Sequence, residues 1–143
     1  MMQYEELWAE VARTCIDKKI VNIELVSIAQ ILRIVFDNNT MLELTSCWRY
    51  RTSKSILLGA LDIGFFQSNT ESKEEADELQ ELITTQEEDH YKKLNTLLDR
   101  TLVNIIFNER ELCLEISGKR YIEWFCLSRD DIGFTAYDEY DQR

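Results

Sequence analysis

Hydrophobic and polar residues alternate along two stretches of the chain, and this alternation predicts β-strands. In the first stretch the strands are expected at residues 19–27, 30–37, 41–45 and 48–61. The last of these ranges contains two strand segments joined by a turn at residues 52–54. A turn is also expected at Asn38-Asn39, because asparagine tolerates a positive φ angle. In the second stretch the strands are expected at residues 102–107, 111–117 and 121–127.

Two other segments repeat their apolar residues with the period of an α-helix. The first is short and runs from Tyr4 to Thr14. The second begins after Ser72, which together with Glu75 fits a capping box. Its apolar face continues for many turns, so residues 70–99 form either one long helix or two helices that meet near residues 84–85.

The two β stretches match each other at an offset of 71 residues, which indicates an internal duplication. At this offset Ile34-Val35-Phe36-Asp37 falls on Ile105-Ile106-Phe107-Asn108, and Arg49-Tyr50 falls on Arg120-Tyr121. We therefore expect two β units that are built alike, with Trp48 and Trp124 each buried within its own unit.

The expected architecture is one α+β domain, with a short N-terminal helix and two related antiparallel β units joined by an acidic helical connector. The domain covers residues 1–143, the first β unit 19–66, the connector 70–99 and the second β unit 101–137. No apolar run approaches the roughly 20 residues of a membrane-spanning helix. The N-terminus is acidic where a signal peptide would be basic. We therefore expect a cytoplasmic protein.

Negative charge is concentrated in two segments. The chain has 27 Asp and Glu against 16 Lys and Arg, a formal net charge of −11. Residues 71–89 carry −8 and residues 130–143 carry −4, which leaves +1 for the rest of the chain. Such a surface repels nucleic acids and anionic membranes. The expected partner is therefore a basic protein.

These two segments supply the residues that are expected to contact the partner. On the predicted helix several acids lie opposite the apolar face, and near the C-terminus acids are mixed with tyrosines, which provide contact area. The predicted partner-binding residues are Glu74, Asp77, Glu78, Glu81, Glu88, Tyr137, Asp138, Glu139, Tyr140 and Asp141. A solvated helix face and a frayed terminus would have the same composition.

Arginines and aromatic residues adjoin at equivalent points of the two β units and suggest an alternative site. Guanidinium groups and aromatic faces together can hold a nucleotide or another anion. The alternative ligand-binding residues are Trp48, Arg49, Arg51, Arg120 and Tyr121. The same arginines could instead pair with acids of neighbouring strands.

The residues that carry enzyme chemistry are sparse. His90 is the only histidine, which excludes a His-rich metal site, and its place on the apolar side of the predicted helix favours a structural role. Neither a nucleophile elbow nor a glycine-rich phosphate loop occurs. Asp62 and Asp131 each open a copy of the tetrapeptide Asp-Ile-Gly-Phe, and a turn at the glycine explains them better than acid-base catalysis. We expect no catalysis, no cofactor and no metal.

The four cysteines, at positions 15, 47, 113 and 126, lack the close spacings of zinc or redox sites. Each has apolar neighbours. They are expected to be free thiols that pack as small hydrophobic residues.

Each β unit has a strand, a turn and a returning strand ahead of an aromatic residue, as at Trp48-Arg49 and Glu123-Trp124. This order resembles a loose group of small bacterial α+β proteins of unknown function. Some of its members are similar to immunity proteins encoded beside secreted toxins. The resemblance implies a single cytoplasmic domain whose work is binding, and it transfers no catalytic residue.

The leading hypothesis is an immunity protein, monomeric or homodimeric, that neutralises a toxin domain. An acidic surface can occupy the basic cleft of a nucleic-acid-cleaving toxin and exclude its substrate. The alternative is a protein that binds or sequesters a nucleotide or another small anion, for example a phage anti-defence factor.

Overall fold

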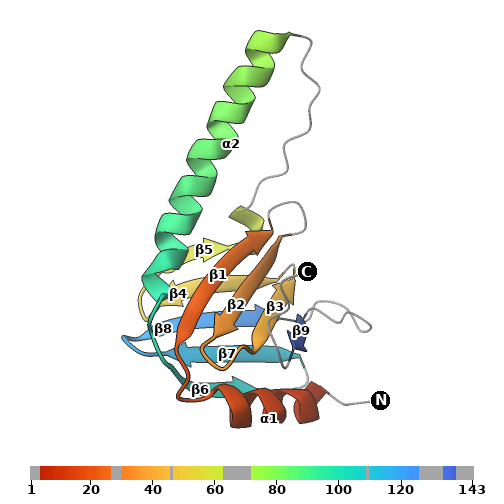
Figure 1. Cartoon of the computed structure of the whole chain (residues 1–143), viewed down its shortest axis with the longest axis vertical. Coiled ribbons are helices and arrows are strands. Elements are labelled where there is room, and N and C mark those ends of the chain that lie inside the picture. Colours follow the sequence, from red (N-terminus) through yellow and green to blue (C-terminus); the bar gives the residue numbers. More distant parts are fainter. Residues whose placement is uncertain are drawn as a thin grey trace.

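The computed structural model describes residues 4–26, 30–45, 47–62, 72–108, 110–125 and 134–137. It shows a short N-terminal helix, one long helix and two antiparallel β-sheets (Figure 1). The predicted α+β fold class is confirmed. Helix α1 spans Tyr4–Cys15 and helix α2 spans Lys73–Leu94, and short 3₁₀ helices cover Ala60–Asp62 and Asn95–Leu97.

All the predicted strands are present, with bounds close to those expected. The strands are β1 (Ile20–Val26), β2 (Ile31–Phe36), β3 (Met41–Thr45), β4 (Trp48–Thr52), β5 (Ile56–Gly59), β6 (Leu102–Phe107), β7 (Glu111–Ile116), β8 (Arg120–Phe125) and β9 (Phe134–Tyr137). Asn39 has a φ of 66°, as the predicted turn between β2 and β3 requires. Strand β9 was not predicted as a separate strand.

Each sheet contains strands from both β units. One sheet has the order β1-β2-β3-β9, and the other has the order β5-β4-β8-β7-β6. Strand β9 of the second unit pairs with β3 of the first, while β4 of the first unit pairs with β8 of the second. Strands β2 and β6 do begin 71 residues apart, at Ile31 and Leu102, as the repeat predicts. The two sheets nevertheless do not correspond to the two units.

The two sheets pack face to face around one hydrophobic core, with β1, β2 and β3 running across the five-stranded sheet (Figure 1). Helix α1 lies beside β6 and closes one end of this core. There Trp8 packs on Trp124 with ring centroids 6.0 Å apart. Trp48 and Trp124 are buried, as predicted, but they lie opposite each other on β4 and β8. Their pairing therefore joins the two units, and the expectation that each would lie within its own unit is wrong.

Helix α2 is one continuous helix that projects away from the two sheets (Figure 1). The hydroxyl of Ser72 accepts a hydrogen bond from the Glu75 N–H at 3.1 Å, which confirms the predicted cap. Thr84 and Thr85 donate to the backbone carbonyl groups four residues earlier, at 3.0 and 2.9 Å. Their hydroxyl groups are thus satisfied within the helix, so the helix continues through them.

The C-terminal end of α2 attaches the helix to the sheets. His90 and Leu94 are its buried residues, and the predicted structural position of His90 is confirmed. The Tyr91 hydroxyl accepts a hydrogen bond from the Leu25 N–H of β1 at 2.9 Å. Since the helix has 22 residues, it is about 33 Å long. Neither described helix combines the length and the apolar character that crossing a membrane requires.

Candidate functional site

Five of the predicted partner-binding acids form a line along α2. Their spacing of three and four residues places them on one face of the helix. All five are exposed, and within the described part of the chain none forms an ion pair. We call this line the acidic face of α2; its residues are Glu74, Asp77, Glu78, Glu81 and Glu88. The face presents concentrated negative charge that no described lysine or arginine pairs with.

An exposed leucine borders the acidic face. Leu82 is 49% exposed, whereas Leu79 and Ile83 on the opposite side of the helix are partly buried. An exposed aliphatic side chain beside carboxylates offers apolar contact area that charge alone does not provide. The helix therefore combines charge with some apolar surface.

The second predicted acidic segment lies mostly outside the described residues. Tyr137 ends β9, where its backbone lies opposite Met41 of β3. Asp138, Glu139, Tyr140 and Asp141 are outside the described residues, as are Asp131 and Cys126. The contribution of this segment to binding stays a prediction.

Asp62 has a structural contact on its N-terminal side, whereas the turn predicted at Gly64 lies outside the described residues. Its carboxylate accepts a hydrogen bond from the Gly59 N–H at 2.7 Å and so closes the turn after β5. This bond accounts for the aspartate without a catalytic role.

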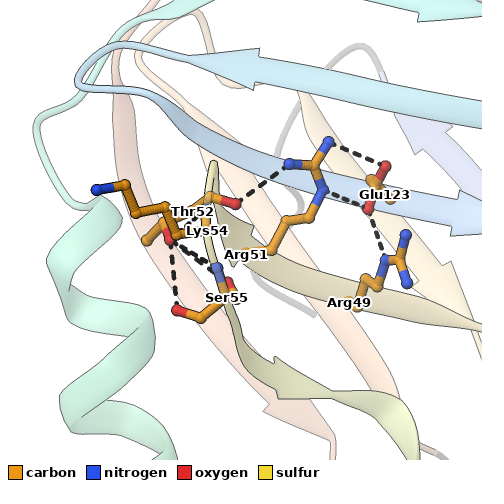
Figure 2. Close-up of polar contacts among 6 residues, drawn as sticks. All are labelled: Arg49, Arg51, Thr52, Lys54, Ser55 and Glu123. Atoms are coloured by element: carbon orange, nitrogen blue, oxygen red, sulfur yellow. Dashed lines mark hydrogen bonds and ion pairs between the residues drawn. The ribbon is translucent and has the colours of Figure 1, made fainter.

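Arg49 and Arg51 meet at a single carboxylate on the outer face of the five-stranded sheet (Figure 2). Nε of Arg49 donates to Oε1 of Glu123 at 2.6 Å, and Arg51 donates from Nε to the same oxygen at 2.7 Å. Arg51 lies 4.4 Å from the Tyr121 ring centroid, and Arg49 lies 5.3 Å from that of Phe125. The two arginines thus pair with an acid of a neighbouring strand, which was one of the two interpretations of their pattern.

The alternative ligand-binding residues do not share one surface. Arg49, Arg51 and Tyr121 lie on the outer face, whereas Trp48 is buried in the core. Arg120 lies on the inner side of the sheet, where it donates to the Tyr50 hydroxyl at 3.1 Å. Residues of opposite parity on a strand point to opposite faces, which explains the separation.

Glu123 accepts hydrogen bonds from both arginines, but it was not among the residues predicted from the sequence. The alternation within β8 contains the signal, because Tyr121 and Glu123 have one parity and the apolar Ile122 and Trp124 have the other. That pattern places Glu123 on the polar side of the strand, next to the arginines of any strand that pairs with β8.

The pKa of Glu123 is set by two opposing effects. Burial raises it, but hydrogen bonds and charge from Arg51 and Arg49 outweigh burial and lower it below the ordinary value of 4.5. The same pairing raises the pKa of Arg51. Glu123 is therefore ionised at neutral pH and holds both guanidinium groups in place.

We expect Glu123→Gln to destabilise the protein at pH 7 by about 1.5 kcal/mol, because hydrogen bonds to charged groups are weakened. A lowered folded-state pKa means that the ionised carboxylate stabilises the fold above pH 4.5, and that this contribution disappears as pH falls through the folded-state pKa. The difference in the free energy of unfolding between the wild type and Glu123→Gln should therefore become smaller on acidification. Urea unfolding at several pH values measures it. A difference that does not change with pH would contradict the assignment.

Cys15 and Cys113 are free thiols, as predicted. Burial raises the pKa of Cys15. Burial and the neighbouring charge of Glu123 raise the pKa of Cys113. A raised pKa keeps a thiol protonated at neutral pH, so neither group is an activated nucleophile.

Comparison of the chain with models of known protein families, with curated proteins and with solved structures found no match. The surfaces described above are therefore the basis for a functional proposal.

Proposed function

We propose that this chain is a non-enzymatic binding protein that neutralises a basic protein partner through the acidic face of α2. The observation that supports the proposal is the placement of five exposed acids, which form no ion pair with a described residue, on a helix that projects from the fold (Figure 1). Like charges four residues apart, as in Glu74 and Glu78, destabilise a helix by a few tenths of a kcal/mol. A cationic partner would remove this repulsion.

An enzyme that cleaves nucleic acid fits such a surface. Its cleft must hold phosphate groups with lysine and arginine, and the carboxylates of α2 can pair with those same side chains. A single helix is narrow enough to enter a cleft, and long-range attraction between opposite charges speeds association. We therefore propose an immunity protein that inhibits a nucleic-acid-cleaving toxin by excluding its substrate.

Binding of a small anion has less support from the geometry. Arg49 and Arg51 already share Glu123, and Arg120 is on the other side of the sheet. An anion would have to compete with Glu123 for guanidinium groups that are already paired.

The proposal predicts that charge reversal on α2 slows association. The double substitution Glu78→Lys and Glu81→Lys should lower the association rate constant about 10- to 100-fold at low salt, and should flatten its dependence on ionic strength. A matched control is Glu6→Lys with Asp37→Lys, because both residues are exposed and lie outside α2, and the change in net charge is the same. The control should associate nearly as fast as the wild type.

The measurement begins with capture of the partner on the immobilised full chain at low salt, followed by purification of the captured protein. Stopped-flow or biosensor kinetics then give the association rate for each variant. The captured protein should also lose its nucleic-acid-cleaving activity at one equivalent of the chain. Equal association rates for both double variants would overturn the role of α2. A captured partner without such activity would overturn the toxin assignment.

A further inference from the structure

The outer face of the five-stranded sheet has a cavity of about 110 Å³ near its β6 edge. Three neighbouring strands form it: Ile106 of β6 lies opposite Cys113 of β7, which lies opposite Glu123 of β8. Phe107, Phe125 and Glu111 also line it. The cavity is half-enclosed and opens to solvent, so a group from another molecule can enter it.

The walls of the cavity are part apolar and part polar. Phe107 and Phe125 are half-buried, and Ile106 is 57% exposed although it is a large aliphatic residue. Covering such a side chain on binding is favourable, because it removes apolar surface from water. The edge of the cavity therefore offers contact area that an incoming apolar group can bury.

The charged groups of the cavity are acidic. Glu111 is exposed and forms no ion pair with a described residue, and the lowered pKa of Glu123 keeps that carboxylate ionised. Among the described residues that line the cavity there is no lysine or arginine. Arg49 and Arg51 balance Glu123 from the side of β4, so Glu111 is the carboxylate that can accept a new cation.

The size of the cavity limits its occupant. Sites for cofactors and drug-sized ligands have about 300–1,000 Å³, which is several times larger. One long side chain fits the volume. A lysine or arginine side chain has an apolar stem and a cationic head, and so matches walls that combine apolar side chains with carboxylates. Its head could also lie against an aromatic ring, as Arg49 does at Phe125.

We propose that this cavity receives one lysine or arginine side chain of a protein partner. The assignment does not depend on the role of α2, because the cavity lies near β6 while α2 contacts β5, and these strands are the two opposite edges of the sheet (Figure 1). The outer face of the sheet is thus a second interaction surface, with Ile106 as its apolar contact and Glu111 as its charged contact.

The test is an NMR titration of the full ¹⁵N-labelled chain with N-acetylarginine N-methylamide. The neutral isostere N-acetylcitrulline N-methylamide serves as the control ligand. The arginine compound should give saturable shifts at Ile106, Cys113 and Phe125 at millimolar concentration, and the citrulline compound should bind several-fold more weakly. Equal affinity for the two compounds, or saturable shifts confined to α2, would overturn the proposal.

Matched variants locate the interaction. Glu111→Gln should weaken binding of the arginine compound about two- to fivefold, which is the range for an exposed ion pair. Glu115→Gln removes a carboxylate from the same strand that does not line the cavity, and should leave the affinity unchanged. Glu78→Lys with Glu81→Lys should also leave it unchanged, which separates this site from α2. Equal effects of the Glu111 and Glu115 substitutions would contradict the assignment.

Discussion

Replacement of Trp124 by alanine should lower the free energy of unfolding by about 3–5 kcal/mol, since large buried side chains leave a cavity when they are truncated. Trp124 is fully buried, its ring packs on Trp8, and it lies opposite Trp48. Its Nε1 donates to the carbonyl oxygen of Thr45 at 3.3 Å, which connects the five-stranded sheet to β3. The substitution would thus open the core where both sheets and α1 meet.

Urea unfolding followed by circular dichroism measures this loss. Phe125→Ala is the control, because the neighbouring side chain lies on the outer face and is only half-buried. Phe125→Ala should lower the free energy of unfolding clearly less than Trp124→Ala does. Equal losses from the two substitutions would mean that Trp124 is not a central packing residue.

Leu94→Ala should cost about 2–5 kcal/mol, the range for a buried leucine, whereas Leu82→Ala on the same helix should change stability by less than about 0.5 kcal/mol. Leu94 is fully buried at the attached end of α2, and Leu82 is 49% exposed. When the packing of Leu94 is lost, the projecting part of α2 should unfold more readily, because isolated helices are only marginally stable in water.

Thermal unfolding followed by the helical circular dichroism signal at 222 nm measures the loss of stability for each of the two variants. The Leu94 variant should lose helical signal at a lower temperature than the wild type, and the Leu82 variant should follow the wild type. Similar losses from both substitutions would show that the exposed part of α2 contributes to stability as much as its attached end does.

Local sequence patterns were sufficient to predict the strands but not the sheets. Alternation shows which face of a strand is apolar, and it located eight of the nine described strands. It does not show which strand will lie alongside. Strand β4 follows β3 after two residues, yet it pairs with β8 in the other sheet. Strand β9 has four residues within an acidic segment, which is too short for the pattern to be recognised.

The candidate site was predictable to different degrees. Helical periodicity placed the acids of α2 on one face, because that spacing is local. Arg49 and Arg51 are 74 and 72 positions from Glu123 in the sequence. Their contact with it therefore depends on the register between β4 and β8. The position of Arg120 on the inner side depends on the same register. Contacts of this kind follow from tertiary pairing and are not contained in a local motif.

Each sheet combines strands of both β units, and we expect this arrangement to affect how the chain folds during synthesis on the ribosome. The hairpin of β4 and β5 can pair with β8 only after β8 has been synthesised. Likewise, one edge of β3 stays unpaired until the chain has been synthesised to residue 137. Unpaired strand edges in a nascent chain can join those of another chain, and long-range pairing forms slowly. The segment synthesised between the two β units carries a charge of −8 over residues 71–89. We expect electrostatic repulsion between such segments to keep neighbouring nascent chains apart during this interval, and so to reduce aggregation of the incomplete protein.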